Sequence, residues 1–203
     1  MSYQDHKVAD FIPEGSIGDW QVERFHVTRD QAALDSIRSL GRSVQPGDYT
    51  ALKNRGHIWM SDTPAEVRDH WEVIYKATGE VLINGLGLGM VAIACLKKPE
   101  VTHVTIVEID QDVIDLVGTH LMDKFPGRVT LVCADAMTWE APKGKRYNVV
   151  WHDIWLNICE DNLEQMGTLH RRYGKRTDWQ GSWSKAECLD RRRNGAARRG
   201  WGW

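Results

Sequence analysis

Four short, mostly apolar runs, separated by segments long enough for a helix, constrain the fold of this chain most strongly. They are residues 81–85 (VLING), 101–110 (VTHVTIVEID), 129–135 (VTLVCAD) and 147–155 (YNVVWHDIW). The runs are continuous rather than alternating, which is typical of strands buried on both faces, as in a parallel sheet. Helices are expected between the first three, over residues 89–96 and 112–124. The pattern predicts an α/β, Rossmann-like fold with a mostly parallel sheet.

The flanking segments predict three parts in the chain. Residues 1–78 form an N-terminal α/β extension, with a helix at 28–40, a hairpin of strands 49–53 and 57–61, and a helix from Pro64 to about residue 77 that leads into the core. In that last helix Thr63 is the expected N-cap and Glu66 completes a capping box. Residues 79–158 are the core. Residues 159–203 hold a helix at 160–173 and then a tail without a predicted strand, so the sheet is expected to be truncated or to be completed by the N-terminal strands.

Composition excludes some classes of protein. Among the 203 residues, no apolar run approaches the roughly 20 residues of a membrane span. The N-terminal residues show no apolar stretch after a basic start, so no signal peptide is predicted and a cytoplasmic protein is expected. The cysteines, which form no CxxC pair, predict free thiols and no metal site: Cys95, Cys133, Cys159 and Cys188.

Charge is distributed unevenly along the chain. Residues 170–203 carry ten Lys or Arg and three Asp or Glu, a balance of +7, so the other residues carry 16 − 25 = −9. The basic end also holds Trp179, Trp183, Trp201 and Trp203. Such a segment could contact nucleic acid through phosphate pairing and base stacking. The alternatives are a solvated tail and a patch that docks on an acidic neighbour. A truncated sheet with an open edge would also favour a homo-oligomer.

A glycine-rich turn follows the first predicted strand. Gly85, Gly87 and Gly89 alternate there, which permits a tight turn and lets backbone N–H groups approach a ligand. Glu108 closes the second strand about 20 residues later, where an acid can accept hydrogen bonds from both ribose hydroxyls. The alternative is a turn that only packs a helix on a strand. The two features together predict a nucleoside site.

Asp135 and Ala136, at the end of the third strand, sharpen this prediction. An acid at that position of an adenosylmethionine site commonly meets the adenine amino group, although Asp135 could simply cap a following turn. The sequence Gly87-x-Gly89-x-x-Ala92 also fits a dinucleotide turn, but a dinucleotide site rarely needs an acid on its third strand. The set Gly85, Gly87, Gly89, Glu108, Asp135 and Ala136 therefore predicts S-adenosylmethionine as the cofactor.

Residues 57–155 resemble the catalytic half of spermidine synthases, a branch of class I adenosylmethionine-dependent transferases. The likeness rests on residues 60–70 (MSDTPAEVRDH), the glycine turn, residues 107–110 (VEID), Asp135-Ala136 and Asp153. It implies an adenosyl-ligand site at Gly85, Gly87, Glu108 and Asp135, with Asp153 facing the reacting centre. The chain also resembles small methyltransferase-like proteins encoded by bacteriophages.

The departures from that family bear on the reaction. Leu88 stands where the family turn carries an Asp that helps hold the aminopropyl donor, and the segment that closes over the polyamine has no visible counterpart. The leading hypothesis is a methyltransferase of unknown acceptor with Asp153 as the catalytic residue. Its neighbour His152 should point to the opposite face unless the strand has ended. The alternatives are an aminopropyltransferase and a non-catalytic nucleotide-fold protein that binds a partner or nucleic acid through its basic tail.

Overall fold

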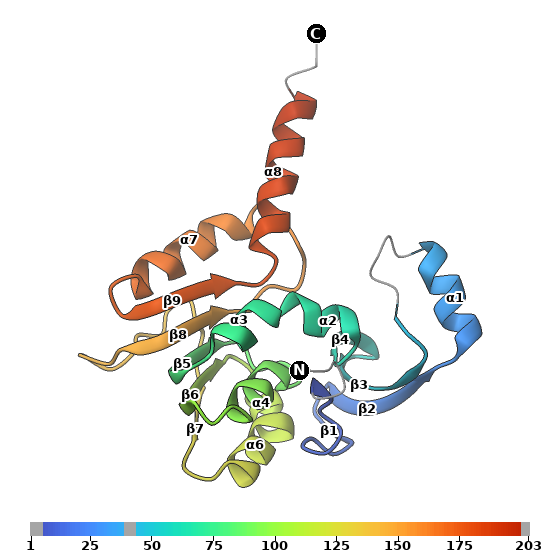
Figure 1. Ribbon diagram of the computed structural model, residues 1–203, viewed down its shortest axis with the longest axis horizontal. Coiled ribbons are helices and arrows are strands. Elements are labelled where there is room, and N and C mark those ends of the chain that lie inside the picture. The colour runs from blue at the N-terminus through green and yellow to red at the C-terminus, as the bar shows by residue number, and fades with distance from the viewer. Residues whose placement is uncertain (1–5, 39–43, 200–203) are drawn as a thin grey trace.

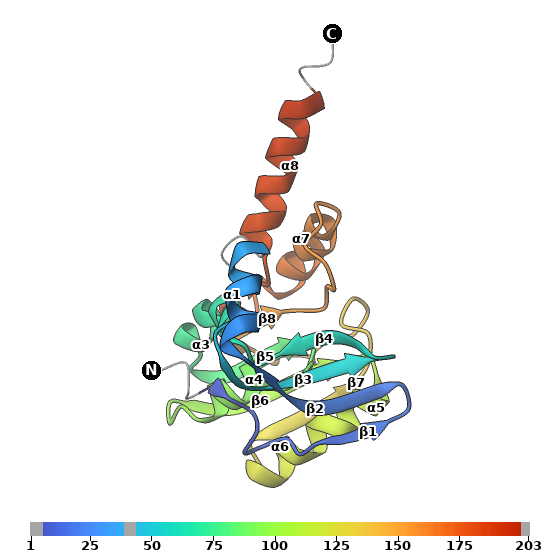
Figure 2. The same cartoon turned by 90° about the vertical axis from the view of Figure 1, so that its right-hand side faces the viewer.

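The structure, a computed structural model, describes residues 6–38 and 44–199 and contains two separate sheets (Figures 1 and 2). The first is antiparallel, in the order β1-β2-β3-β4, and the second has five strands in the order β7-β6-β5-β8-β9. The antiparallel strands are β1 (Gly15–Ile17), β2 (Trp20–Val27), β3 (Gly47–Asn54) and β4 (His57–Ser61). The strands of the second sheet are β5 (Gly79–Asn84), β6 (Val101–Glu108), β7 (Val129–Cys133), β8 (Tyr147–His152) and β9 (Thr177–Ser182).

All four pairings in the second sheet are parallel. The chain first moves outward from β5 through β6 to β7, and then crosses back to place β8 and β9 on the other side of β5. This is the strand order of a Rossmann-like half, and the α/β prediction is confirmed. The chain reverses its direction of travel between β5 and β8, so a ligand crevice is expected outside the carboxyl ends of these two strands.

Both faces of the parallel sheet are covered, which explains the continuous apolar runs. Val81 and Ile83 belong to a core cluster with α3 (Trp71–Lys76), α4 (Met90–Leu96) and α6 (Thr119–Lys124). Leu82, between them, belongs to a second cluster with α7 (Asn162–Tyr173). Successive strand residues point to opposite faces, so each face contributes its own apolar set.

The absence of a strand after Gly174 was a wrong prediction. β9 pairs in parallel with β8 and extends the sheet. Its sequence, TDWQGS, has no apolar run because it is an edge strand and four of its six residues are only partly buried. Backbone pairing with β8, rather than burial of its side chains, therefore defines β9.

The hairpin of β3 and β4 was predicted, whereas β1 and β2 were not. β2 pairs with β3 over eight residues, so the hairpin is the end of a four-stranded meander. The helix after β2 is α1 (Arg29–Arg38), and Thr28 caps it as predicted: Thr28 Oγ1 accepts a hydrogen bond from the Gln31 amide at 3.2 Å. Predicted helical residues 39 and 40 lie outside the described residues.

The helix that leads into the core departs from its predicted form. It is broken at His70 into α2 (Pro64–Asp69) and α3, and Thr63 makes no side-chain capping bond. Thr63 Oγ1 instead accepts a hydrogen bond from the Ser61 hydroxyl at 3.1 Å. The capping-box prediction was therefore wrong, because a nearer hydroxyl competes for the cap oxygen.

Two remaining helical segments complete the described chain. The predicted helix at 112–124 is divided into α5 (Gln111–Val113), a π-helical turn η2 (Ile114–Gly118) and α6. The tail forms α8 (Lys185–Arg199), which projects away from the rest of the molecule (Figures 1 and 2). Within the described residues, no helix is both long and apolar enough to cross a membrane. The four cysteines are free.

Candidate functional site

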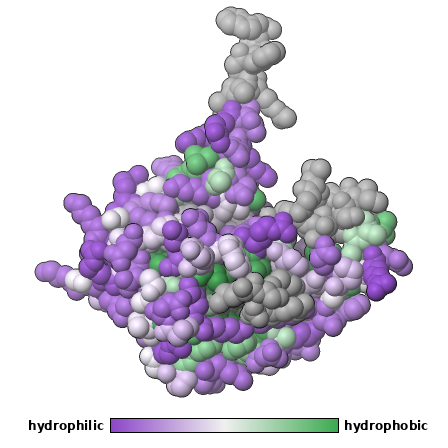
Figure 3. Space-filling view, viewed as in Figure 1, coloured by the Kyte–Doolittle hydropathy of each residue, from purple (hydrophilic) through white to green (hydrophobic). Residues whose placement is uncertain are grey.

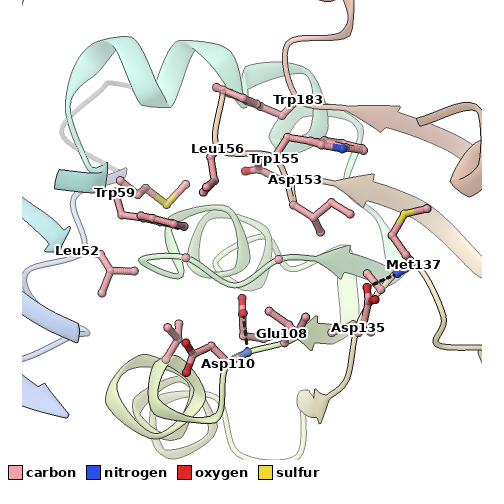
Figure 4. Close-up of a pocket in the computed structure, with 18 of the residues that line it drawn as sticks. Leu52, Trp59, Glu108, Asp110, Asp135, Met137, Asp153, Trp155, Leu156 and Trp183 are labelled. Atoms are coloured by element: carbon pink, nitrogen blue, oxygen red, sulfur yellow. Dashed lines mark hydrogen bonds between the residues drawn. The ribbon is translucent and has the colours of Figure 1, made fainter. Parts of the chain in front are cut away.

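A cavity of about 640 Å³ lies at the carboxyl ends of β5, β6 and β8, between the parallel sheet and the antiparallel sheet (Figure 4). Five of the lining residues carry carboxylates and four are tryptophans. The carboxylates are Glu66, Glu108, Asp110, Asp135 and Asp153. The tryptophans are Trp20, Trp59, Trp155 and Trp183. Most of the predicted site therefore converges here, at the expected crevice.

The three glycines of the turn all have positive φ, but they differ in position. Gly85 (φ +97°) and Gly87 (φ +50°) line the cavity, whereas Gly89 (φ +76°) lies outside the lining. Gly89 is the N-cap of α4, where a Cβ would come within 3.2 Å of Val117. Gly85 is the most constrained, because a Cβ there would stand 2.0 Å from the Asp153 carbonyl oxygen. Only glycine allows β5 and β8 to approach so closely at the crevice.

Four amide donors of the turn are already engaged within the protein. The Gly85 amide donates to the Val107 carbonyl, the Leu86 amide to Glu108 Oε2 and the Gly89 amide to the Leu86 carbonyl. The Leu88 amide donates to Met60 Sδ at 3.2 Å. Met60 comes from β4 and covers the turn, with its sulfur 2.6 Å from the place of a Cβ on Gly87.

Glu108 ties the turn to the loop after β6. Its two oxygens accept hydrogen bonds from the Leu86 amide at 2.8 Å and the Asp110 amide at 3.0 Å. Each carboxylate oxygen has a second acceptor site, so Glu108 can still bind two donors in the cavity. Asp110 in turn accepts a hydrogen bond from Trp20 Nε1 at 2.7 Å, and this bond joins the two sheets.

Asp135 both caps a turn and lines the cavity. Its Oδ1 accepts a hydrogen bond from the Met137 amide at 2.7 Å (Figure 4), as the simple capping alternative would require. Asp135 is only partly buried, and Ala136 beside it is buried and also lines the cavity. The capping bond uses one oxygen, so the second oxygen retains its acceptor capacity.

Asp153 stands just beyond the end of β8, on the cavity side. Its amide donates to the Asn84 carbonyl at 2.8 Å, and its side chain is 15% exposed. Burial, aided by the negative charges of Glu66, Asp69 and Glu108, raises the pKa of Asp153 to about 8. His70 Nε2, at the break between α2 and α3, lies 3.4 Å from Asp153 Oδ2. At neutral pH the Asp153 carboxyl is therefore largely protonated.

His152 lies on the opposite face, as the strand alternation predicts. Its Nδ1 accepts a hydrogen bond from Asn84 Nδ2 at 2.8 Å, and its ring packs against Tyr173 and His170 on α7. Burial lowers the pKa of His152 to about 3. His152 is a neutral core residue and does not line the cavity.

Sequence analysis missed three of the four tryptophans that line the cavity, namely Trp20, Trp59 and Trp183. Trp20 and Trp59 come from the antiparallel sheet, with ring centroids 5.2 Å apart in a T-shaped pair. Trp155 follows β8, and Trp183 follows β9. Trp155 and Trp183 bound the upper side in Figure 4, and Trp59 bounds the left. Local pattern cannot show that these distant segments meet, although the high tryptophan content was a signal.

The charge of the cavity is one-sided. Its lining residues, all of them described, include five acids and no Lys or Arg. His70 also lines the cavity. Within the described residues no cluster of His, Cys, Asp or Glu has the arrangement of a metal site. The cavity therefore favours a cationic ligand with a flat aromatic part.

Several solved structures resemble part of this chain. A candidate RNA methyltransferase from Pyrococcus horikoshii is 16% identical with a TM-score of 0.44, over 59% of this chain and 58% of that protein. A candidate methyltransferase from Escherichia coli is 21% identical with a TM-score of 0.44, over 54% and 62%. The 23S rRNA methyltransferase ErmE is 18% identical with a TM-score of 0.42, over 55% and 41%. This chain thus spans less than two thirds of each of them. No protein-family model matches it.

Proposed function

We propose that this chain binds S-adenosylmethionine and transfers its methyl group to an acceptor. One observation carries the proposal: the glycine turn, Glu108 and Asp135 meet in an acidic, tryptophan-lined cavity whose lining includes no Lys or Arg. The cavity lies at the carboxyl edge of a parallel sheet, between β5 and β8, where open α/β sheets bind ligands.

The residues present fit an adenosyl sulfonium. Glu108 has acceptor sites left for the two ribose hydroxyls, and the second oxygen of Asp135 can accept from the adenine amino group. Ala136 leaves space for a flat ring beside Asp135. The acidic lining favours the positive sulfur over a neutral or anionic group, although Asp153 is protonated in the free protein.

The protein's part in the reaction is alignment and proton transfer. The bound sulfonium supplies an already activated methyl carbon, so the chain has to hold the acceptor in line with it. Asp153 Oδ2 lies on the cavity side and next to His70 Nε2, where the pair can take a proton from an amine or hydroxyl acceptor. The Asp153 carboxyl is largely protonated in the free protein. The positive sulfonium of the bound ligand therefore has to lower the pKa of Asp153, so that the carboxyl loses its proton before it can accept another.

A dinucleotide fits the cavity less well. A pyrophosphate needs free backbone N–H donors or a cation, and four amides of the turn are engaged inside the protein. The carboxylates at the rim would repel it.

Aminopropyl transfer is the second candidate, and one observation favours it. The Leu88 amide is covered by Met60, so the turn lacks one donor for the carboxylate that adenosylmethionine carries. Decarboxylated adenosylmethionine has no such group and would also suit the acidic lining. Leu88 itself, which replaces the acid expected in the spermidine synthase-like turn, counts against this candidate.

Calorimetric titration tests the proposal. The purified chain is titrated with adenosylmethionine, its demethylated product, decarboxylated adenosylmethionine and NAD. We expect the first two to bind, and Glu108→Ala to weaken binding by roughly 10- to 100-fold, since hydrogen bonds to a charged group are lost. Asp123→Ala, which removes an exposed carboxylate on α6, is the control and should bind as the parent does.

Each other outcome has a distinct meaning. Strong preference for the decarboxylated ligand would replace methyl transfer by aminopropyl transfer. Binding of NAD alone would exclude both. Binding of none of the four would leave a non-catalytic protein that keeps the nucleotide fold.

A further inference from the structure

The helix α8 is an arm that leaves the rest of the protein after its first turn. Cys188 is fully buried and Leu189 lines a small pocket against β9, which anchors the base of the helix. From Asp190 to Asn194 every side chain is exposed. Figures 1 and 2 show the arm extending away from the body, and Figure 3 shows hydrophobic residues only near its base among the described part.

The outer part of the arm carries only one sign of charge. Residues 191–199 contain five Arg and no acidic residue. They also lack the apolar stripe with which a helix packs on a protein. An isolated helix of this length is marginal in water, so an outer half without a packing face gains most from a partner of opposite charge. The composition points to a polyanion.

The position of the arm links it to the cavity. Trp183 lines the cavity, and α8 begins two residues later, after Ser184, whose φ of +49° makes a sharp turn. Three exposed apolar residues also line the cavity, namely Trp59 at 45% exposure, Leu156 at 57% and Ile109 at 67%. A polymer held on the arm thus passes an aromatic, acidic opening.

Because the arm is basic and the cavity is acidic, the two attract different parts of a polyanion. Arg191, Arg192 and Arg193 attract phosphates, whereas the acidic side chains of the cavity, apart from the protonated Asp153, repel them. A nucleobase carries no charge and stacks on tryptophan. Charge and stacking therefore favour a base, rather than the phosphate backbone, in the cavity.

We propose that α8 binds the phosphate backbone of single-stranded nucleic acid and presents one base to the cavity as the methyl acceptor. A single strand is required because a paired base cannot enter a cavity without first leaving the stack. The arm's binding of nucleic acid stands independently, whereas the base as acceptor rests on the proposed function.

Fluorescence anisotropy with a labelled single-stranded 12-mer RNA tests the arm. The triple variant Arg191→Gln, Arg192→Gln, Arg193→Gln is compared with a triple control on the body, Lys76→Gln, Lys124→Gln, Lys143→Gln. All six side chains are exposed, and each triple removes the same charge. We expect the arm variant to bind at least about tenfold more weakly at low salt. The slope of log K against log salt should fall by about 2, since each lost phosphate contact removes about 0.7. The control should keep the parental slope.

Two results would contradict the proposal that α8 binds nucleic acid. One is an equal loss of binding in both triple variants, which would show only the effect of net charge. The other is equal or tighter binding of phosphatidylserine vesicles or a poly-glutamate peptide to the parent chain, which would assign α8 to a membrane or an acidic protein. A duplex that binds better than its single strand would contradict the choice of single-stranded nucleic acid.

The acceptor is tested separately. Adenosylmethionine carrying a tritiated methyl group is incubated with the parent chain and with single-stranded oligonucleotides of mixed sequence. We expect label in the RNA or DNA, and a raised KM for the oligonucleotide with nearly unchanged kcat in the arm variant. Calorimetry without nucleic acid should give the same affinity for adenosylmethionine in the arm variant and the parent. Binding of both ligands without transfer of label would refute the base as acceptor and leave the arm and the adenosyl site standing.

Discussion

The cavity has two walls that are built in different ways. The wall at the edge of the parallel sheet consists of a backbone turn and of carboxylates that accept hydrogen bonds from backbone amides, as Glu108 does. The wall from the antiparallel sheet consists of side chains that pack, namely Trp20, Leu52, Trp59 and Met60. The first, which we call the polar wall, can fix individual ligand atoms. The second, the apolar wall, supplies contact area. Two hydrogen bonds join them: Trp20 Nε1 donates to Asp110 Oδ2, and the Leu88 amide donates to Met60 Sδ.

The largest effect is expected where the polar wall has no room to adapt. Gly85→Ala places a Cβ 2.0 Å from the Asp153 carbonyl oxygen at a φ of +97°. The free energy of unfolding should fall by about 3 kcal/mol, from backbone strain and overpacking together. Denaturant unfolding measures it.

Gly127→Ala is the matched control for this substitution. Its φ is +73°, but no heavy atom lies within 4 Å of a Cβ there. It should cost only about 1–2 kcal/mol. Equal losses at the two positions would mean that the close approach of β5 and β8 does not constrain the turn.

The next effect concerns the pH dependence of the polar wall. The pKa of Asp153 is about 8, so a cationic ligand that favours the carboxylate should displace a proton. Affinity for adenosylmethionine should rise with pH, by up to about tenfold per unit below pH 8, and level off above it. Titration calorimetry in buffers of different ionisation enthalpy should detect the released proton at pH 7. Asp153→Asn should abolish both effects.

The same carboxyl group affects stability with a definite sign. Between about pH 4 and pH 8 the folded protein keeps a proton that the unfolded chain has lost. Stability should therefore fall as pH rises through this window, and Asp153→Asn should flatten the decline. An unchanged pH profile in the variant would show that Asp153 is ionised in the folded protein.

A smaller effect is expected at the joint between the walls. Trp20→Phe keeps an aromatic ring but removes the Nε1–H that binds Asp110 at 2.7 Å. The free energy of unfolding should fall by about 1–2 kcal/mol, since the acceptor is a carboxylate. Trp59→Phe makes the same change in the same wall. The described residues include no hydrogen-bond acceptor for the Trp59 indole nitrogen, so this substitution should lower the free energy of unfolding by less. Equal costs would show that ring size, rather than the hydrogen bond, joins the walls.

The smallest effect is expected where the apolar wall covers the turn. Met60→Ala exposes the Leu88 amide that now donates to Met60 Sδ. Binding of adenosylmethionine, which has a carboxylate to accept that bond, should tighten about two- to fivefold relative to the decarboxylated ligand. Met60→Leu, which keeps most of the bulk, should leave the ratio unchanged. Competition calorimetry measures the ratio.

Local sequence pattern accounts for the polar wall. The continuous apolar runs place β5, β6, β7 and β8 in one parallel sheet, and the carboxyl ends of parallel strands meet at one edge. Gly85, Glu108, Asp135 and Asp153 stand at the carboxyl ends of those strands or within two residues of them, so their convergence was predictable from the strand pattern. Gly89 was placed in the same set because it shares the turn, but it faces the core beside Val117.

Tertiary structure decided the rest. Trp20 on β2, Trp59 on β4 and Trp183 just after β9 meet around the cavity, and no local periodicity shows that these distant segments are neighbours. β9 lacked an apolar pattern because its place at the sheet edge leaves most of its side chains partly exposed. The high pKa of Asp153 arises from burial and from carboxylates on α2 and β6, which only the folded chain brings together. The sequence by itself thus determined the parallel core and the turn that a ligand would meet. The aromatic wall, the protonated carboxyl and the projecting arm required long-range packing, because each depends on segments that are neighbours only in space.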